Sequence, residues 1–360
     1  MKGFSRYLAF SALAACTASP TARQEDLDVL AGQHVIYSYA GTIPPARLLE
    51  LARQGKVGGI ILFGANIDNG TGAAIETIQA AAEEYPGNNG MPLLIMTDQE
   101  GGLVRRIKSG GPFLSAKEMG ASDDPAAASA QGGEEAYEAL APVGINTNLA
   151  PVLDVYHQPG DFEDYFQRSF GNTSCLVSKC VAPFISTQQA RGVIATAKHF
   201  PGLGAASHAE NTDETAVTLN RSLLEIRAKD EVPYRAAMKA GVKMVMASWA
   251  VYPSLDPERP AGLSLKWIRD ELRGRLGFSG VTITDALEAG ALTSFGGVET
   301  RAVLAAQAGM DLLLASAQNS TQGETVMNAV AAALADGTLS RTDFDAATSR
   351  ILSLRRFLSS

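Results

Sequence analysis

Eight short aliphatic runs recur along the chain, each bounded by Gly, Pro or Asn. Their apolar residues are consecutive and do not alternate with polar ones, which is typical of strands buried on both faces of a parallel sheet. The predicted strands cover residues 34–41, 57–63, 92–98, 146–155, 195–200, 244–250, 280–285 and 310–316.

Stretches rich in Ala, Leu and Glu separate these runs, and their apolar residues follow the helical period. The predicted helices cover residues 45–54, 71–84, 124–140, 222–240, 264–276, 298–309, 325–335 and 343–358. Strands that alternate with helices indicate a parallel sheet. Eight repeats favour closure into a (β/α)8 TIM-type barrel over an open doubly wound sheet, because no Gly-rich phosphate loop follows the first strand. We therefore predict an α/β fold.

Composition agrees with one well-packed domain. Of the 360 residues, 46% are hydrophobic and 19% are charged, and no linker or low-complexity stretch divides the chain. We predict that residues 28–358 form the barrel. A net charge of −8 with only 30 basic residues offers no basic patch for nucleic acid.

The first 20 residues are predicted to be a signal peptide. Lys2 and Arg6 precede an apolar stretch, residues 7–15, that is too short to span a membrane and is followed by small residues. Residues 13–16, Leu-Ala-Ala-Cys, also match a bacterial lipobox, in which Cys16 would carry a lipid anchor. Both interpretations place the mature protein outside the cytoplasm, and the lipid would be its one membrane contact.

Cys175 and Cys180 lie five residues apart in the predicted mature chain. In an oxidising compartment they could close a small disulfide loop. Four histidines in the whole chain give no spacing typical of a metal site, so we expect neither a metal nor an organic cofactor.

Ionisable residues stand where four of the predicted strands end. Asp285 follows a β-branched run and precedes a helix-prone segment, so it could cap a helix or act as a nucleophile. Lys198 and His199 end another strand before a Pro-Gly loop and could donate hydrogen bonds to a polyhydroxylated ligand. Asp98 and Asp154 end two more strands, and carboxylates suit vicinal sugar hydroxyls. In a barrel these ends form the catalytic face.

Arg106 and five short motifs occur along the chain: Asp98-Gln-Glu-Gly-Gly, Ala150-Pro-Val-Leu-Asp154, Arg168-Ser-Phe-Gly, Lys198-His-Phe-Pro-Gly and Thr284-Asp285. Their order is typical of glycoside hydrolase family 3. The chain resembles that family, and within it the single-domain β-N-acetylhexosaminidases, over roughly residues 28–358. The resemblance implies a (β/α)8-like barrel that cleaves β-linked sugars with retention of configuration.

The resemblance also implies a role for each matching residue. Asp285 matches the nucleophile that forms the glycosyl-enzyme, and Asp154 matches a position that binds the sugar or supports the site. The residues that match the holders of the sugar in the −1 subsite are Asp98, Arg106, Arg168, Lys198 and His199.

One departure from the family concerns the acid/base. A retaining hydrolase needs a second group that protonates the leaving oxygen, and this branch takes a histidine from an Asp-Ser-His triplet in the loop after Lys-His-Phe-Pro-Gly. The triplet is missing here, and by loop length Asn211 or Thr212 replaces the histidine. The candidate substitutes are His208, Glu210 and Asp213, of which His208 is narrowly preferred.

The resemblance therefore implies a secreted or lipid-anchored retaining β-glycosidase, most similar to a β-N-acetylglucosaminidase, with fragments of chitin or peptidoglycan as the expected substrates. Two alternatives stay open. One is a β-glycosidase or glycoside phosphorylase of other sugar specificity. The other is a carbohydrate-binding relative without turnover, which the missing triplet favours and the retained Asp285 disfavours.

Overall fold

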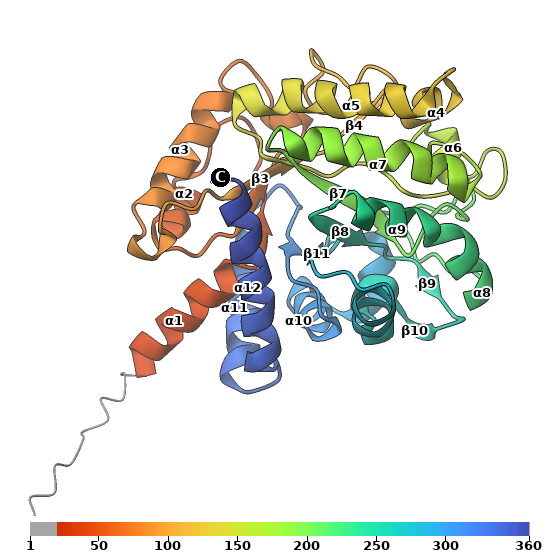
Figure 1. The fold of residues 1–360 in the computed structure, drawn as a ribbon. Helices are drawn as coiled ribbons and strands as arrows, with labels where there is room; N and C mark the ends of the chain where they lie inside the picture. Colours follow the sequence, from red (N-terminus) through yellow and green to blue (C-terminus); the bar gives the residue numbers. More distant parts are fainter. Residues whose placement is uncertain (1–19, 360) are drawn as a thin grey trace, which may run out of the picture.

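A computed structural model describes residues 20–359 and confirms the predicted fold class (Figure 1). Cys16 and the rest of the predicted leader before Pro20 lie outside the described residues. All eight predicted strands are present and pair in parallel, in the order β11-β8-β7-β6-β3-β2-β1-β12. Their bounds are β1 (Val35–Tyr37), β2 (Gly59–Ile61), β3 (Leu94–Thr97), β6 (Thr147–Asn148), β7 (Ile194–Phe200), β8 (Met244–Ala247), β11 (Val281–Ile283) and β12 (Leu313–Leu314).

A parallel bridge between Ile283 and Leu312 joins the two edges of the sheet, so that the strands enclose a barrel. Aliphatic side chains fill its interior, as expected for this fold. Ile351 and Leu354 of the last helix join the same apolar cluster. Because the interior is packed, a ligand site in this fold is expected at the C-terminal ends of the strands.

Helices surround the barrel and follow the predicted segments with two differences (Figure 1). The segments 222–240 and 264–276 contain π-helical turns, and three helices before residue 191 were not predicted, besides a helix that begins at Pro20. The helices are α1 (Pro20–Gly32), α2 (Ala46–Arg53), α3 (Thr71–Glu83), α4 (Ala116–Ala121), α5 (Pro125–Leu140), α6 (Phe162–Tyr165), α7 (Ser174–Ala190), α8 (Leu223–Glu225), η4 (Ile226–Asp230), α9 (Val232–Lys239), η6 (Lys266–Arg275), α10 (Val298–Ala308), α11 (Ser320–Ala335) and α12 (Arg341–Phe357).

Short elements complete the described chain. Two antiparallel hairpins, β4 (Gln99–Gly101) with β5 (Val104–Arg105) and β9 (Val251–Tyr252) with β10 (Asp256–Pro260), follow strand ends. The 3₁₀ turns are η1 (Gly64–Asn66), η2 (Pro86–Asn88), η3 (Ala141–Val143), η5 (Ala261–Leu263) and η7 (Gly290–Phe295). None of the helices within residues 20–359 has both the length and the apolar character that a membrane crossing requires.

The suggested disulfide is wrong, because both cysteines lie in helix α7. Thr173 caps this helix by accepting a hydrogen bond from the backbone N–H of Leu176. Five residues along a helix turn a side chain by about 140°, so the two thiols point to different sides. Cys175 is exposed, Cys180 is buried, and both are free.

A buried carboxylate ties the closing strand of the barrel to its neighbours. Asp311, just before β12, accepts hydrogen bonds from the Thr282 N–H of β11 at 2.9 Å and from Arg273 Nη2 of η6 at 2.7 Å. Arg350 Nη2 of α12 lies 2.6 Å from its other oxygen. The side chain is fully buried, where an ion is tolerated only if it is paired and hydrogen-bonded.

We expect Asp311→Asn to lower the free energy of unfolding by about 3–5 kcal/mol, because two guanidinium groups lose their buried counter-ion. Urea denaturation followed by circular dichroism measures the change. Asp343→Asn is the matched control, since Asp343 forms an ion pair with Arg269 at the surface and should cost no more than about 1 kcal/mol. Equal losses in the free energy of unfolding for the two variants would contradict a stabilising role of the ion pairs of Asp311.

Candidate active site

A cavity of about 330 Å³ opens at the C-terminal ends of the barrel strands. Apolar side chains from the strands, including Ile61, Met246 and Leu314, form part of its lining. The hairpin β4–β5, the segment around α6 and the loop after β7 form the rest. Six of the eight predicted site residues line this cavity: Asp98, Arg106, Arg168, Lys198, His199 and Asp285.

Five charged residues of the cavity form one continuous chain of ion pairs. Lys198 Nζ lies 2.9 Å from Asp98 Oδ1 and 2.7 Å from Glu100 Oε1. Arg106 Nη2 lies 3.3 Å from the other oxygen of Asp98. Arg168 holds Glu100 with two hydrogen bonds of 2.8 Å. Glu100 belongs to the motif that predicted Asp98 but was not predicted as a site residue.

Each charge in this chain keeps its neighbour ionised. Burial alone would raise the pKa of Asp98, but Lys198 and Arg106 hold it below its ordinary value. Burial alone would lower the pKa of Lys198, but Asp98 and Glu100 hold it above its ordinary value. The cavity therefore offers fixed donors and acceptors to a polar ligand.

The two glycines of the Asp-Gln-Glu-Gly-Gly motif fold this part of the site. Gly101 has φ of 119° and Gly102 has φ of 52°, where other residues are strained. A Cβ on Gly101 would also collide with the carbonyl oxygen of Leu114. The tight hairpin lets Gln99 Oε1 accept hydrogen bonds from the N–H of Arg106 at 2.9 Å, which brings that arginine over Asp98.

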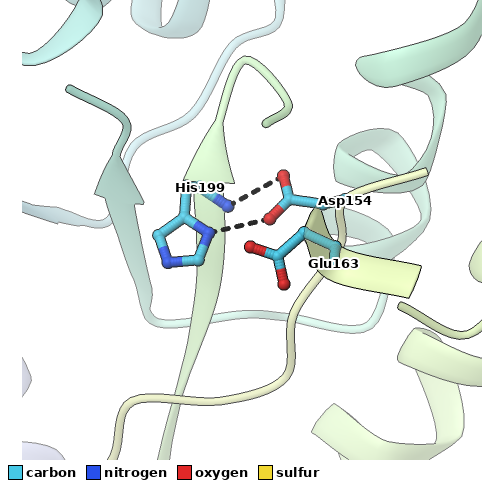
Figure 2. Close-up of side chains that lie close together, drawn as sticks. All are labelled: Asp154, Glu163 and His199. Atoms are coloured by element: carbon cyan, nitrogen blue, oxygen red, sulfur yellow. Dashed lines mark hydrogen bonds and ion pairs between the residues drawn. The ribbon is translucent and has the colours of Figure 1, made fainter. Parts of the chain in front are cut away.

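Asp154 lies behind the cavity wall and fixes His199. Its Oδ2 accepts a hydrogen bond of 2.7 Å from His199 Nδ1, and its Oδ1 accepts from the His199 N–H at 3.2 Å and the Leu203 N–H at 2.6 Å (Figure 2). Burial alone would lower the pKa of His199, but Asp154 raises it. The structure thus gives Asp154 a supporting position.

Glu163, for which the sequence carried no signal, completes a buried trio with Asp154 and His199 (Figure 2). Each residue offers one ligand atom, which is a carboxylate oxygen of Asp154 or Glu163 or a ring nitrogen of His199. These three atoms lie within 4.8 Å of one another, which is the spacing of a candidate metal site. However, the 2.7 Å between His199 Nδ1 and Asp154 Oδ2 is shorter than the about 3.3 Å between two ligands of a tetrahedral zinc ion. Arg168 also donates to Glu163 at 3.1 Å. The geometry fits a hydrogen-bonded network, in which burial, opposed by Arg168, raises the pKa of Glu163 to about 7.

Asp285 lies half-buried at the end of β11 and faces the cavity. Its Oδ1 accepts a hydrogen bond of 2.7 Å from the N–H of Ala286. No helix begins directly after it, because the next helical turn, η7, starts at Gly290. Asp285 therefore does not cap a helix, and its carboxylate is left at the mouth of the barrel.

The loop after β7 brings a second carboxyl group to this cavity. Asp213 lines it beside Asn211 and Thr212, the two positions that replace the missing histidine. Desolvation by the surrounding protein and then the charge of Asp285 raise the pKa of Asp213 to about 6. Asp213 is exposed at the mouth of the cavity, and the charge of Asp285 favours its protonated form, so that about half of its molecules carry a proton at about pH 6.

The backbone of this loop docks on the segment that follows Asp285. The Gly290 N–H donates to the carbonyl of Asp213 at 2.8 Å, and the Ala291 N–H donates to that of Thr212 at 3.1 Å. A side chain at Gly290 would collide with the carbonyl of Glu214. Glycine at this position therefore permits the close approach that brings Asp213 to the cavity.

The other two acid/base candidates do not line the cavity. His208 is exposed, and its ring packs against Tyr165 with 3.9 Å between the ring centroids. Glu210 Oε2 accepts a hydrogen bond of 2.7 Å from the Ser207 N–H and so closes a turn of the loop. The preference for His208 as the acid/base stays a prediction, and the place of His208 outside the lining of the cavity does not favour it.

Comparisons with known proteins identify the family of this chain. The model of the glycosyl hydrolase family 3 N-terminal domain matches residues 41–354. An uncharacterized secreted glycosyl hydrolase of Arthroderma benhamiae is 52% identical over 354 residues, which are 98% of this chain and 99% of that protein. A β-hexosaminidase of Stenotrophomonas maltophilia is 34% identical over 78% of this chain and 82% of its own length.

Two solved structures have the same fold. The family 3 β-N-acetylglucosaminidase from Paenibacillus sp. str. FPU-7 superimposes with a TM-score of 0.86 and 32% identity over 92% of this chain, which spans 62% of that protein. The β-N-acetylhexosaminidase from Beutenbergia cavernae gives 0.81 and 34% over 91% of this chain and 98% of its own. From the family match, these relatives and the site geometry, the chain belongs to glycosyl hydrolase family 3.

Proposed function

We propose that this protein is a retaining β-N-acetylglucosaminidase in which Asp285 is the nucleophile and Asp213 is the acid/base. The observation that carries the proposal is the pair of coupled carboxyl groups in one cavity, one of them with a pKa raised to about 6. The β-hexosaminidase and β-N-acetylglucosaminidase relatives support the choice of sugar.

In the first step the sugar occupies the cavity, and the ion-paired side chains bind its hydroxyl groups. The Asp285 carboxylate attacks the anomeric carbon and forms an ester bond to it, while the bond to the leaving oxygen breaks. The carboxylic acid of Asp213 transfers its proton to that oxygen.

In the second step a water molecule attacks the same carbon and releases Asp285 as a carboxylate. Asp213, now ionised, accepts the proton of this water, so that both residues return to their starting forms. A carbohydrate-binding relative without turnover would have no use for two coupled carboxyl groups that face the anomeric carbon.

We expect Asp285→Asn to reduce kcat for 4-nitrophenyl β-N-acetylglucosaminide at least about 10³-fold, because an amide cannot form the ester intermediate. Release of nitrophenol measures the rate, and the melting temperature reports folding. Asp345→Asn, which removes an exposed carboxylate paired with Arg341, is the control and should keep the parent rate. A nearly unchanged rate in Asp285→Asn would exclude this nucleophile.

Asp213→Asn should lower kcat/KM about 10²–10⁴-fold for N,N′-diacetylchitobiose and far less for the activated nitrophenyl substrate, since only a poor leaving group needs the proton. His208→Ala is the comparison variant, and it should lower kcat/KM for N,N′-diacetylchitobiose by no more than about tenfold, because His208 lies outside the lining of the cavity. If His208→Ala shows the selectivity and Asp213→Asn does not, the acid/base is His208.

The pH dependence follows from the same assignment. The pKa of Asp213 is raised to about 6, so the proton is present below pH 6 and lost above it. We expect kcat/KM for diacetylchitobiose to fall as the pH rises through about 6. This limb should disappear in Asp213→Asn, and its persistence there would assign it to another group.

We further propose that residues 1–20 direct export, in line with the secreted relative from Arthroderma benhamiae. Intact mass of the exported protein tests this proposal. A new N-terminus after the leader is expected for a soluble secreted form, whereas an acylated Cys16 at the N-terminus would establish lipid anchoring instead. Retention of Met1 in the exported form would contradict both.

A further inference from the structure

An aromatic cluster stands beside the cavity and takes no part in the chemistry proposed above. Tyr165 of α6 and Phe166 after it pack edge to face, with ring centroids 5.0 Å apart. His208 reaches them from the loop after β7, with its ring 3.9 Å from Tyr165 and 6.0 Å from Phe166. Phe162 packs beneath Phe166 at 4.8 Å. Below, "the rim platform" means Tyr165, Phe166 and His208.

The rim platform is exposed although it is apolar. Tyr165 is 58% exposed and Phe166 is 37% exposed, and Leu103 at the tip of the β4–β5 hairpin is 64% exposed. Grouped apolar side chains left in water on a soluble protein mark binding surfaces. The rings of Tyr165, Phe166 and His208 nevertheless pack against one another, so they are ordered before any ligand binds.

The platform is continuous with the active-site cavity. Phe162, Phe166 and Leu103 line that cavity together with the ion-paired residues and both carboxyl groups. Phe166 therefore belongs to both surfaces, and Tyr165 and His208 contact it from outside the lining of the cavity. The platform thus lies next to a sugar that fills the cavity, within reach of its leaving group.

We propose that the rim platform binds the sugar ring of the leaving group, which makes it a subsite for the second residue of a β-linked N-acetylglucosamine oligosaccharide. This inference rests on the proposed function. All ring substituents of β-N-acetylglucosamine are equatorial, so each face of the ring presents axial C–H groups. Such a face matches the electron-rich face of an aromatic ring.

The platform also gives His208 a role that its position supports. Its ring packs against Tyr165 and Phe166 instead of facing Asp285. As the loop carries both His208 and Asp213, stacking of the second sugar would hold the loop over the substrate. Binding of the leaving group would then stabilise the position of the proposed acid.

The test compares two substrates with the same first sugar. N,N′-diacetylchitobiose has a sugar leaving group, whereas β-N-acetylglucosaminyl fluoride has a single atom that cannot reach the platform. In Tyr165→Ala we expect the ratio of kcat/KM for diacetylchitobiose to that for the fluoride to fall at least about fivefold. Tyr165→Phe keeps the ring and should restore the ratio. Leu224→Ala, which truncates another exposed side chain outside the lining of the cavity, should keep it.

Affinities measured without turnover test the rim platform independently of the proposed function. In an Asp285→Asn background, calorimetry with diacetylchitobiose and with N-acetylglucosamine gives the two affinities without turnover. The added Tyr165→Ala change should weaken the disaccharide at least about fivefold more than the monosaccharide. An unchanged affinity ratio would overturn the platform even if the parent enzyme hydrolyses both substrates. Failure of the parent to hydrolyse the fluoride would overturn the proposed function, while the affinity ratio still decides the platform.

Discussion

The site depends on pairing charges that are buried at the rim of the barrel. Lys198 and Glu100 are almost inaccessible to solvent, and each would be costly there without its partners. Because Asp98 and Glu100 lie directly after β3, Lys198 lies in β7 and Arg168 follows α6, the ion pairs also join three separate segments. Loss of one charge would leave the next uncompensated. The chain of pairs thereby holds its side chains in one arrangement before a ligand arrives, which is what differential binding of a transition state requires.

A buried charge also needs its partners where β11 meets β12 and the barrel closes. The strands of the sheet are only two to seven residues long, so each contributes few ladder hydrogen bonds. Asp311 compensates by joining β11, η6 and α12 through one carboxylate. The loops at the cavity can move or change in sequence without opening the barrel, because the ion pairs of Asp311 lie at the N-terminal ends of the strands, away from the cavity. Stability and chemistry are therefore assigned to opposite ends of the strands.

The fold and the strand-end residues of the site could be predicted because both follow from local pattern, whereas Arg106 and Arg168 came only from the resemblance to family 3. Consecutive aliphatic residues identified the eight strands, and polar residues at strand ends must meet on one rim. Helix α7 was missed since Pro183 interrupts its pattern, although the capping Thr173 was a usable signal. A raised pKa of Asp213 through desolvation in the loop was foreseeable, but Glu163 and the effect of Asp285 on Asp213 were not. Burial raises the pKa of both groups, and the charges of Arg168 and Asp285 that modify it reach them only through the fold.

In the proposed mechanism, burial and then the charge of Asp285 raise the pKa of Asp213, which lets this aspartate act as the acid. A nearby carboxylate favours the protonated form of any neighbour, whether this is an imidazolium or a carboxylic acid. In the proposed reaction Asp285 loses its charge when it becomes an ester, so the pKa of Asp213 falls at the moment when a base is needed. When water cleaves the ester, the charge returns and the pKa rises again. A single electrostatic coupling thus supplies the acid for the first step and the base for the second.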